Sequence, residues 1–516
     1  MIRRDAHDAG EKTYDLVVIG GGIYGAVLTL SAAQRGLRTL LLEREDFGAA
    51  TSHNSLRIIH GGLRYLQTAD LGRFQDSVND RRWFLQNFPG LVRPLPCIMP
   101  LYDRGVRRVP VLRLALFVND LLSRARNQNI PPANQLPGAK IIDAIELRRI
   151  VPIVDTSGLK AGAVWYDAWM PDSQRVLMEI LHWACDLGAT ALNYVEAVRA
   201  RTDGGKLVGI EARDSVAGHD YLFRVNVAVN ATGPWSAVLA RRFNAQSGIV
   251  LHQSIAWNVV LDRPPVSNHA VAVTPRQRGS QTYFLLPWKG KILAGTGHAP
   301  WKKGPERPMP STEHLDSFIE KLNSAVPGLG LSRRSILRVF AGLLPAANPM
   351  SAELAVREIV HDHSGDGGIE GLWTVCGVKF TNARSVANRL LDRIFPKSRP
   401  HADTQGSTRS PRANALASAA PVSGYDYDWL PPGNDGWGKA LRGVISDEAV
   451  QHLDDLVLRR TSLGDNARRA LKLSAPLCEL FDWTEDRRAS EVERLRDAYA
   501  WNGGEPLASE ARLGRS

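Results

Sequence analysis

Three glycines near the start of the chain have a spacing that binds phosphate groups. Gly20, Gly22 and Gly25 follow an apolar run and form the pattern G-x-G-x-x-G. The first glycine permits a tight turn, the second lets the backbone approach a pyrophosphate, and the third lets a helix pack closely on a strand. The diphosphate would lie at the N-terminus of that helix, where free N–H groups and the helix dipole favour anions. The spacing therefore predicts a nucleotide-binding site.

The segments around these glycines have the order that a nucleotide-binding βαβ unit requires. A buried strand is predicted over Tyr14–Ile19, a helix over Ala26–Arg35 and a second strand over Thr39–Leu42. Glu43 ends the second strand and follows Gly20 by close to the ~20 positions expected for the acid that accepts the ribose hydroxyls. The alternative is a glycine-rich turn without a ligand. We favour a dinucleotide because strand, turn, helix, strand and acid occur in this order.

The loop after Glu43 indicates which dinucleotide binds. Ala49, Ala50, Thr51 and Ser52 are small or hydroxylated and are crowded together in this loop. Such a loop can lie against a second stretch of cofactor, whereas a simple NAD-binding unit would continue into another βαβ repeat. The sequence therefore favours FAD.

Four further motifs resemble those of a known family. They are His60-Gly-Gly-Leu-Arg-Tyr-Leu66, Asp172-Ser-Gln-Arg175, Asn230-Ala-Thr-Gly-Pro-Trp235 and Thr374-Val-Cys-Gly-Val-Lys-Phe-Thr-Asn-Ala-Arg384. Together with the glycine turn they resemble the FAD-dependent glycerol-3-phosphate dehydrogenases, within the broader group of D-amino-acid-oxidase-like flavoproteins. The resemblance extends over roughly residues 14 to 395.

The resemblance implies an α/β fold with a discontinuous, Rossmann-like FAD-binding domain over residues 14–75, 160–248 and 337–396. An inserted α+β substrate domain with an antiparallel sheet would comprise residues 76–159 and 249–336. A linker is expected over residues 397–425 and a short helical C-terminal domain over residues 426–505, with helices at Asp447–Arg460, Asn466–Phe481 and Ser490–Tyr499. This C-terminal domain would form a partner- or dimer-forming cap, or simply pack on the body. Residues 1–13 are expected to be a loose tail.

The resemblance also implies a reaction and the residues that carry it out. A hydride would pass from the secondary alcohol of a polyol phosphate to flavin N5, and the electrons would pass to a quinone. Arg64, Tyr65 and Lys379 are expected to bind a small anionic substrate, with glycerol 3-phosphate as the first candidate, and His60, Arg64 and Lys379 to act in catalysis. The residues expected to contact FAD are Gly20, Gly22, Gly25, Glu43, Thr51, Ser52, Gly61, Gly62, Gly233, Lys379 and Thr381.

The reaction needs a base for the hydroxyl proton, and histidine is the usual choice near neutral pH. His60 is the first candidate because it lies in the glycine-rich segment; the alternative is a structural histidine that fixes this loop. His298 and His252 are weaker candidates.

Two departures from the family pattern concern the substrate. Leu344 stands where the family usually has an arginine that binds the substrate phosphate, and His298 stands where an acid is expected. These changes keep two alternatives open. The first is an oxidase or dehydrogenase of another small anion, such as an amino acid or a hydroxy acid. The second is a flavin-binding protein without turnover of its own.

The net charge of +11 suggests an anionic partner. No nucleic-acid-binding module is evident. An apolar stretch, 109–122, follows Arg104-Gly-Val-Arg-Arg108 and precedes Arg124 and Arg126, which suits a helix lying on an anionic membrane surface. The alternative is a core helix with solvated ends.

The remaining expectations concern location and assembly. The four cysteines, Cys97, Cys185, Cys376 and Cys478, lack metal-binding or redox spacing, so no metal site is expected and a reducing compartment is favoured. No signal peptide is recognised. We expect a cytoplasmic protein, with peripheral binding to the inner face of the cytoplasmic membrane and a homodimer as further options.

Overall fold

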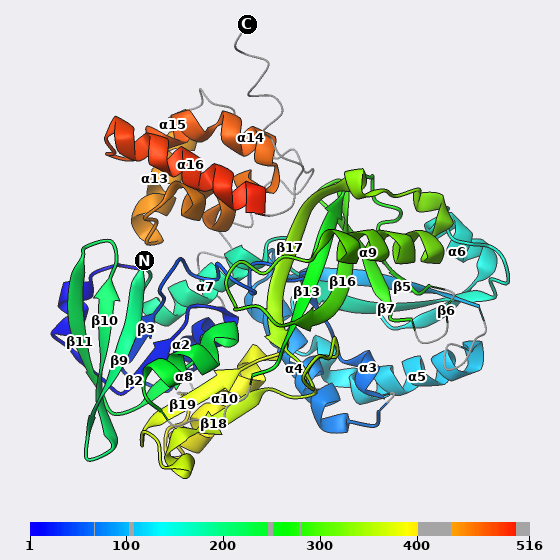
Figure 1. Ribbon diagram of the computed structural model, residues 1–516. Helices are drawn as coiled ribbons and strands as arrows, with labels where there is room; N and C mark the ends of the chain where they lie inside the picture. Colours follow the sequence, from blue (N-terminus) through cyan, green and yellow to red (C-terminus); the bar gives the residue numbers. More distant parts are fainter. Residues whose placement is uncertain are drawn as a thin grey trace, which may run out of the picture.

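The computed structural model describes residues 1–66, 68–102, 108–245, 251–275, 277, 280–400 and 435–501. Within these residues the chain forms three β-sheets with helices packed on them (Figure 1). The predicted linker over residues 397–425 lies outside the described residues from residue 401 onward.

The first sheet has six strands in the order β18-β19-β12-β2-β3-β8 and is parallel except for the edge strand β18. The strands are β2 (Leu16–Ile19), β3 (Thr39–Leu42), β8 (Thr190–Leu192), β12 (Ala228–Asn230), β18 (Ile359–Asp362) and β19 (Leu372–Cys376). The central strands β2 and β3 are buried along their whole length, as expected for parallel strands that are covered on both faces. The prediction of a strand over Thr39–Leu42 is confirmed.

Helices cover one face of this sheet and a second, smaller sheet covers the other. Helices α2 (Ile23–Ala33), α7 (Ser173–Asp186) and α10 (Ala383–Ile394) share one apolar core with it. On the opposite face lie helix α8 (Ser236–Arg242) and a four-stranded sheet. The strands of the smaller sheet are β1 (Thr13–Tyr14), β9 (Val195–Asp203), β10 (Lys206–Asp214) and β11 (His219–Val225). Helix α2 packs between α7 and α10, which explains why its sequence is apolar on every side.

The third and largest sheet has nine strands and lies beside the first (Figure 1). Its order is β17-β13-β16-β15-β14-β5-β7-β4, and β6 pairs with β7. The strands are β4 (Ile58–Ile59), β5 (Arg93–Leu101), β6 (Lys140–Asp143), β7 (Ala161–Trp169), β13 (Gln253–Leu261), β14 (Ala270–Val273), β15 (Tyr283–Trp288), β16 (Lys291–Trp301) and β17 (Ile336–Pro345). Helix α9 (Thr312–Ala325) packs on one face and α5 (Val109–Leu122) contributes to the core of the other.

Two of the predicted domain boundaries need correction. The sequence assigns the segments 161–169 and 337–345 to the FAD-binding domain, but they belong to β7 and β17 of the nine-stranded sheet. Strand β7 pairs with β5, and β17 pairs with β13 along its whole length. An apolar strand has the same pattern in either sheet, because only its pairing partner decides which sheet it joins.

Four further helices and six single turns complete the described part of the body. They are α1 (Ala6–Gly10), α3 (Leu63–Leu66), α4 (Leu71–Asn87) and α6 (Ala144–Ile150), with single turns at η2 (Arg124–Asn127), η3 (Pro132–Asn134), η4 (Gly233–Trp235), η5 (Pro327–Leu329), η6 (Arg333–Ser335) and η7 (His363–Asp366). The prediction of a loose tail over residues 1–13 is wrong. Ile2 is fully buried and pairs with Glu448, and α1 follows it.

The C-terminal helical domain, residues 435–501, gathers on one side of the body (Figure 1). Its elements are α13 (Asp435–Asp447), the π-helix η8 (Asp455–Arg460), the turn η9 (Leu463–Asp465), α14 (Ala467–Lys472), α15 (Ser474–Cys478) and α16 (Glu485–Trp501). The predicted helix over Asp447–Arg460 is wrong. The chain leaves the helix at Glu448, which pairs with Ile2, and Ala449 takes a positive φ of 52°. The predicted helix over Asn466–Phe481 is divided into α14 and α15.

Candidate flavin and substrate site

A cavity of about 340 Å³ lies where the carboxyl ends of the parallel strands meet the nine-stranded sheet. Ligands in open parallel sheets bind at this end of the strands. Its lining comes from the ends of β2, β3, β12 and β19 and from β13, β16 and β17. The predicted site residues that line it are Gly20, Gly22, Glu43, Thr51, Ser52, His60, Gly233, Lys379 and Thr381.

The glycine turn has the geometry that the sequence predicts. Gly20 has a φ of 108°, in a region that side-chain-bearing residues rarely adopt. A Cβ atom at Gly25 would collide with the carbonyl oxygen of Gly20. Gly22 is the N-cap of α2 and lines the cavity together with Ile23 and Tyr24, so the N-terminus of this helix lies at the cavity wall. The turn therefore leaves room for a pyrophosphate beside the helix N-terminus.

Glu43 is held at the cavity wall by two backbone groups. Its Oε2 accepts a hydrogen bond of 2.6 Å from the N–H of Gly21, and its Oε1 accepts one of 2.8 Å from the N–H of Glu45. Burial raises the pKa of Glu43 to about 7, although these hydrogen bonds act in the opposite direction. A carboxyl group in this position can accept hydrogen bonds from ribose hydroxyls.

The hydroxylated loop residues are also fixed. Ser52 Oγ accepts a hydrogen bond of 2.9 Å from the N–H of Ile23 in the first turn of α2. Thr51 Oγ1 donates to the carbonyl oxygen of Leu343 over 3.1 Å and accepts from the N–H of the same residue over 3.2 Å. The loop thus joins the glycine turn to strand β17.

His60 is paired with an acid that the sequence analysis missed. Its Nδ1 lies 3.1 Å from Oδ2 of Asp167, a buried residue of β7. Burial alone would raise the pKa of Asp167, but the hydrogen bond with His60 and the charges of His60 and Arg81 lower it to about 2. An ionised Asp167 holds the proton on Nδ1, which leaves Nε2 as the basic nitrogen of the ring. A single acid in the otherwise apolar strand Ala-Gly-Ala-Val-Trp-Tyr-Asp-Ala-Trp is the signal that could have identified Asp167.

Asp167 is held by three further donors. It accepts hydrogen bonds from the N–H of Gly61 (2.7 Å), from Nη1 of Arg81 (3.0 Å) and from Nε1 of Trp165 (3.3 Å). A Cβ atom at Gly61 would collide with the guanidinium of Arg81. Gly61 and Gly62, for which the sequence predicts contacts with FAD, are not among the described residues that line the cavity. In the structure Gly61 makes room for the group that supports Asp167.

Lys379 and Tyr65 meet although they are far apart in sequence. Lys379 Nζ donates a hydrogen bond to the Tyr65 hydroxyl and lies 4.4 Å from the centre of its ring. The backbone oxygen of Lys379 accepts a hydrogen bond of 3.0 Å from Tyr24. Arg64 is exposed and stands outside the described lining. The structure thus brings His60 and Lys379 to one cavity, with Tyr65 beside Lys379, whereas the exposed Arg64 is not among the described lining residues.

Of the two departures from the family pattern, only Leu344 is among the described residues that line this cavity, whereas His298 lines a second cavity beside Trp257. Leu344 lines the cavity and pairs with Ser254 of β13, so an aliphatic side chain stands at that point of the wall. Burial, with a smaller contribution from the charge of Arg64, lowers the pKa of His298 to about 4, so this ring is neutral at pH 7. His252 stands outside the described lining.

The residues present fit an adenine dinucleotide. The glycine turn at the helix N-terminus suits the diphosphate, and Glu43 suits the ribose. Gly233 has a φ of 54°, and a Cβ atom added to it would have nothing within 4 Å, so the wall is open there.

Comparisons with known proteins identify the family and the relatives of this chain. The family described as DAO, FAD dependent oxidoreductase, matches residues 15–391. A glycerol-3-phosphate dehydrogenase of Synechocystis is 29% identical, over 87% of this chain and 80% of that protein. The aerobic glycerol-3-phosphate dehydrogenase of Bacillus subtilis is also 29% identical, over 75% of this chain and 68% of its own length.

The fold has a close counterpart among solved structures. The glycerol-3-phosphate dehydrogenase from Bacillus halodurans, complexed with FAD, superposes with a TM-score of 0.71, covers 97% of both chains and is 22% identical. The predicted fold class and FAD as the cofactor are therefore confirmed. This chain belongs to the DAO family of FAD-dependent oxidoreductases.

Proposed function

We propose that this oxidoreductase is a dehydrogenase that oxidises the secondary alcohol of a polyol phosphate, with glycerol 3-phosphate as its substrate. The observation that carries the proposal is the His60–Asp167 pair at the cavity wall, in one cavity with Lys379. The names of the relatives, glycerol-3-phosphate dehydrogenases, support the choice of substrate.

In this proposal each residue of the site has a defined role in the reaction. Bound FAD supplies the hydride acceptor. His60 takes the hydroxyl proton at Nε2, and Asp167 keeps the ring in the required tautomer and stabilises the cation that forms. Lys379 supplies a positive charge at the cavity wall, and Tyr65 fixes the direction of its ammonium group. The exposed Arg64 attracts an anionic substrate through its charge.

The visible spectrum of the purified protein, recorded without oxygen before and after addition of glycerol 3-phosphate, tests this proposal. Bleaching of the oxidised-flavin band is the expected result. A yellow protein that does not bleach would refute glycerol 3-phosphate as the substrate.

A second candidate function follows from Leu344. An aliphatic residue at this point of the wall offers no charge to a phosphate, so an amino acid or a hydroxy acid is the alternative substrate. The same spectral assay with a panel of such acids separates the two candidates.

We expect Leu344→Arg to lower the KM for glycerol 3-phosphate by about tenfold, because a charge-assisted hydrogen bond contributes ~1.5–3 kcal/mol. The measurement is steady-state kinetics, with Leu344→Met as a control that preserves volume without charge. An unchanged KM in the arginine variant, together with good turnover of a non-phosphorylated acid, would favour the second candidate.

We further propose that the protein binds an anionic membrane surface through α5 and that the electron acceptor is a quinone in that membrane. Only Leu112 and Leu116 of α5 are buried. The opposite face exposes five apolar side chains to between 41% and 66%: Val111, Leu114, Phe117, Leu121 and Leu122. Arg108, Arg113 and Arg124 are exposed on or beside this helix. This arrangement argues against the core-helix alternative and has the form of an interfacial helix.

The described part of the chain contains no helix that is long and apolar enough to span a bilayer. Arg104 and Arg107 of the predicted basic flank lie outside the described residues. The apolar residues of α5 are therefore the better target for a test.

Leu114→Glu combined with Phe117→Glu is expected to weaken binding to phosphatidylglycerol vesicles at least tenfold, because burying each side chain contributes ~1.5–3 kcal/mol. Co-sedimentation with the vesicles measures it. Val216→Glu, at an exposed apolar residue of the smaller sheet's hairpin, is the matched control. Equal sedimentation of the double variant and the control would exclude α5 as the membrane contact.

A further inference from the structure

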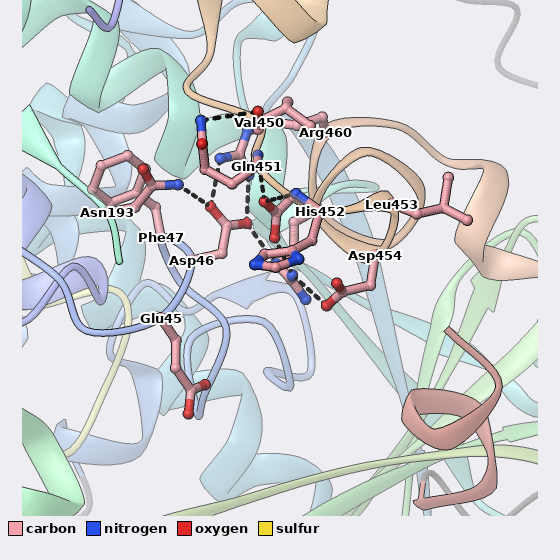
Figure 2. A network of polar contacts seen from close by, with 12 residues as sticks. Glu45, Asp46, Phe47, Asn193, Val450, Gln451, His452, Leu453, Asp454 and Arg460 are labelled. Atoms are coloured by element: carbon pink, nitrogen blue, oxygen red, sulfur yellow. Dashed lines mark hydrogen bonds and ion pairs between the residues drawn. The ribbon is translucent and has the colours of Figure 1, made fainter. Parts of the chain in front are cut away.

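A buried ionic network joins the C-terminal helical domain to the loop that follows Glu43 (Figure 2). Asp46 Oδ2 accepts hydrogen bonds from Nε of Arg459 (2.6 Å) and Nη1 of Arg460 (2.7 Å). Its Oδ1 accepts from Nη2 of Arg460 (2.6 Å) and from the amide of Asn193 (3.1 Å). Both oxygens of this carboxylate are thus engaged, mostly by two residues of the π-helix η8.

The network is desolvated and its charges are paired. Asp46 is 1% exposed, Arg459 8% and Arg460 4%. Arg459 also contacts Asp454 (2.7 Å) and Asp455 (2.6 Å). Removing one member of such a group leaves an uncompensated buried charge, which is far costlier than losing a surface ion pair. The position of Asp46 is therefore strongly specified by the C-terminal helical domain.

The far end of the same loop is also tied to that domain. Arg338 Nη2 contacts His53 Nε2 over 3.3 Å, and Arg338 Nη1 donates to the carbonyl oxygen of Gly464 over 2.9 Å. Tyr499 donates to the same carbonyl oxygen over 3.0 Å. Beside them, Lys289 forms a buried ion pair with Asp465. Both ends of the segment 46–53 are thus held, directly at Asp46 and through Arg338 at His53.

The residues between these two anchors reach the cofactor cavity. The N–H of Gly48 donates to the carbonyl oxygen of Gly21 over 3.0 Å, and Ser52 binds the first turn of α2. Glu43 lies three positions before Asp46 and lines the same cavity. The shape of this loop therefore decides where the glycine turn, Thr51 and Ser52 stand.

We propose that Arg459 and Arg460 are positioning residues for FAD, so that the C-terminal helical domain is part of the cofactor site. Because the loop is held at both ends, its polar groups already have, in the flavin-free protein, the positions in which they contact FAD. Without the arginines, the loop would become ordered only when FAD binds. The free-energy cost of ordering it would then lower the affinity for FAD. The inference rests on the assignment of Glu43, Thr51 and Ser52 to the cofactor, as predicted from the sequence.

The test measures FAD affinity and not only activity. Arg459→Gln and Arg460→Gln are prepared as full-length protein, stripped of flavin and titrated with FAD by fluorescence, well below the unfolding temperature. We expect the Kd for FAD to rise at least tenfold. The gain in Tm on adding FAD should shrink in parallel, since that gain follows the ratio of ligand concentration to Kd.

A matched control separates positioning from general stability. Glu491 is a buried carboxylate of the same domain that accepts from His452 (2.8 Å) and from the N–H of Leu453 (2.9 Å), and its described hydrogen bonds and ion pairs include none with Asp46, Arg459 or Arg460. Glu491→Gln should lower the Tm but leave the Kd for FAD within twofold. If the arginine variants likewise show a lower Tm but the wild-type Kd for FAD, the role of Arg459 and Arg460 is purely structural and the inference fails.

Two further variants decide the remaining outcomes. If Arg460→Gln does not fold, Arg460→Lys retains the charge but lacks the two-pronged contact with Asp46, and an unchanged Kd in this variant would overturn the inference. Glu43→Ala is measured alongside. If it retains FAD with wild-type affinity, the assignment of the cofactor residues fails; if it loses FAD while the arginine variants do not, only the positioning role fails.

Discussion

Replacement of His60 by glutamine is expected to lower kcat for glycerol 3-phosphate by about 10²–10⁴-fold, the usual contribution of general acid–base catalysis. The glutamine amide can still donate a hydrogen bond to Asp167, but it cannot take up the hydroxyl proton. Bound FAD should be retained, because the glycine turn, Glu43 and Ser52 are untouched. Rapid mixing without oxygen, which follows the bleaching of the flavin band, measures the effect on the reductive step.

Two further variants test whether the effect is specific to the His60–Asp167 pair. Asp167→Asn should also lower kcat, because a neutral amide neither fixes the Nδ1–H tautomer nor stabilises a charged ring. His219→Gln, at an exposed residue of the smaller sheet, serves as the control for loss of a histidine elsewhere. A rate of flavin reduction in His60→Gln within threefold of the wild-type rate would contradict the catalytic role. His60 would then be a structural residue that fixes its loop, which is the alternative that the sequence left open.

Replacement of Glu43 by alanine is expected to release FAD, with a rise in Kd of at least about 100-fold. The variant loses an acceptor for two ribose hydroxyls, and each hydrogen bond to a charged group contributes ~1.5–3 kcal/mol. It also leaves the N–H groups of Gly21 and Glu45 without their carboxylate partner. Dialysis followed by an absorption spectrum measures the retained flavin. A variant that stays yellow would contradict the ribose assignment.

The raised pKa of Glu43 predicts how FAD binding depends on pH. Burial raises this pKa from 4.5 to about 7, so the carboxyl of the flavin-free protein is largely protonated at pH 6. The ionised form is the better acceptor for ribose hydroxyls, so the Kd should fall by up to about tenfold per pH unit as the pH rises toward 7 and level off above it. Glu43→Gln, which cannot ionise, should bind FAD with no such dependence.

The raised pKa of Glu43 also determines how the free energy of unfolding of the flavin-free protein changes with pH. Between pH 4.5 and about 7 the folded flavin-free protein binds more protons at Glu43 than the unfolded chain does. The contribution of this group to the free energy of unfolding therefore decreases as pH rises through that range.

The parts of the site that are local in the chain could be predicted from the amino-acid sequence. The glycine turn, the strand Thr39–Leu42 and Glu43 form one contiguous unit, and each signal reinforces the next. The helix Thr312–Ala325 is likewise local, because its apolar spacing and its Ser311 cap lie within the same stretch. Fold class, cofactor and family follow from such segments.

Contacts between residues that are distant in the chain could not be predicted in this way and are seen only in the folded protein. Asp167 reaches His60 because β7 pairs with β4 and β5, and Lys379 reaches Tyr65 across most of the chain. The contact of Asp46 with Arg459 and Arg460 has no signal in the sequence, and the sequence left open whether α5 lies in the core or at an interface. Apolar periodicity shows that a strand or helix has a buried side. It does not say which partner covers that side, because pairing and burial depend on the whole folded chain.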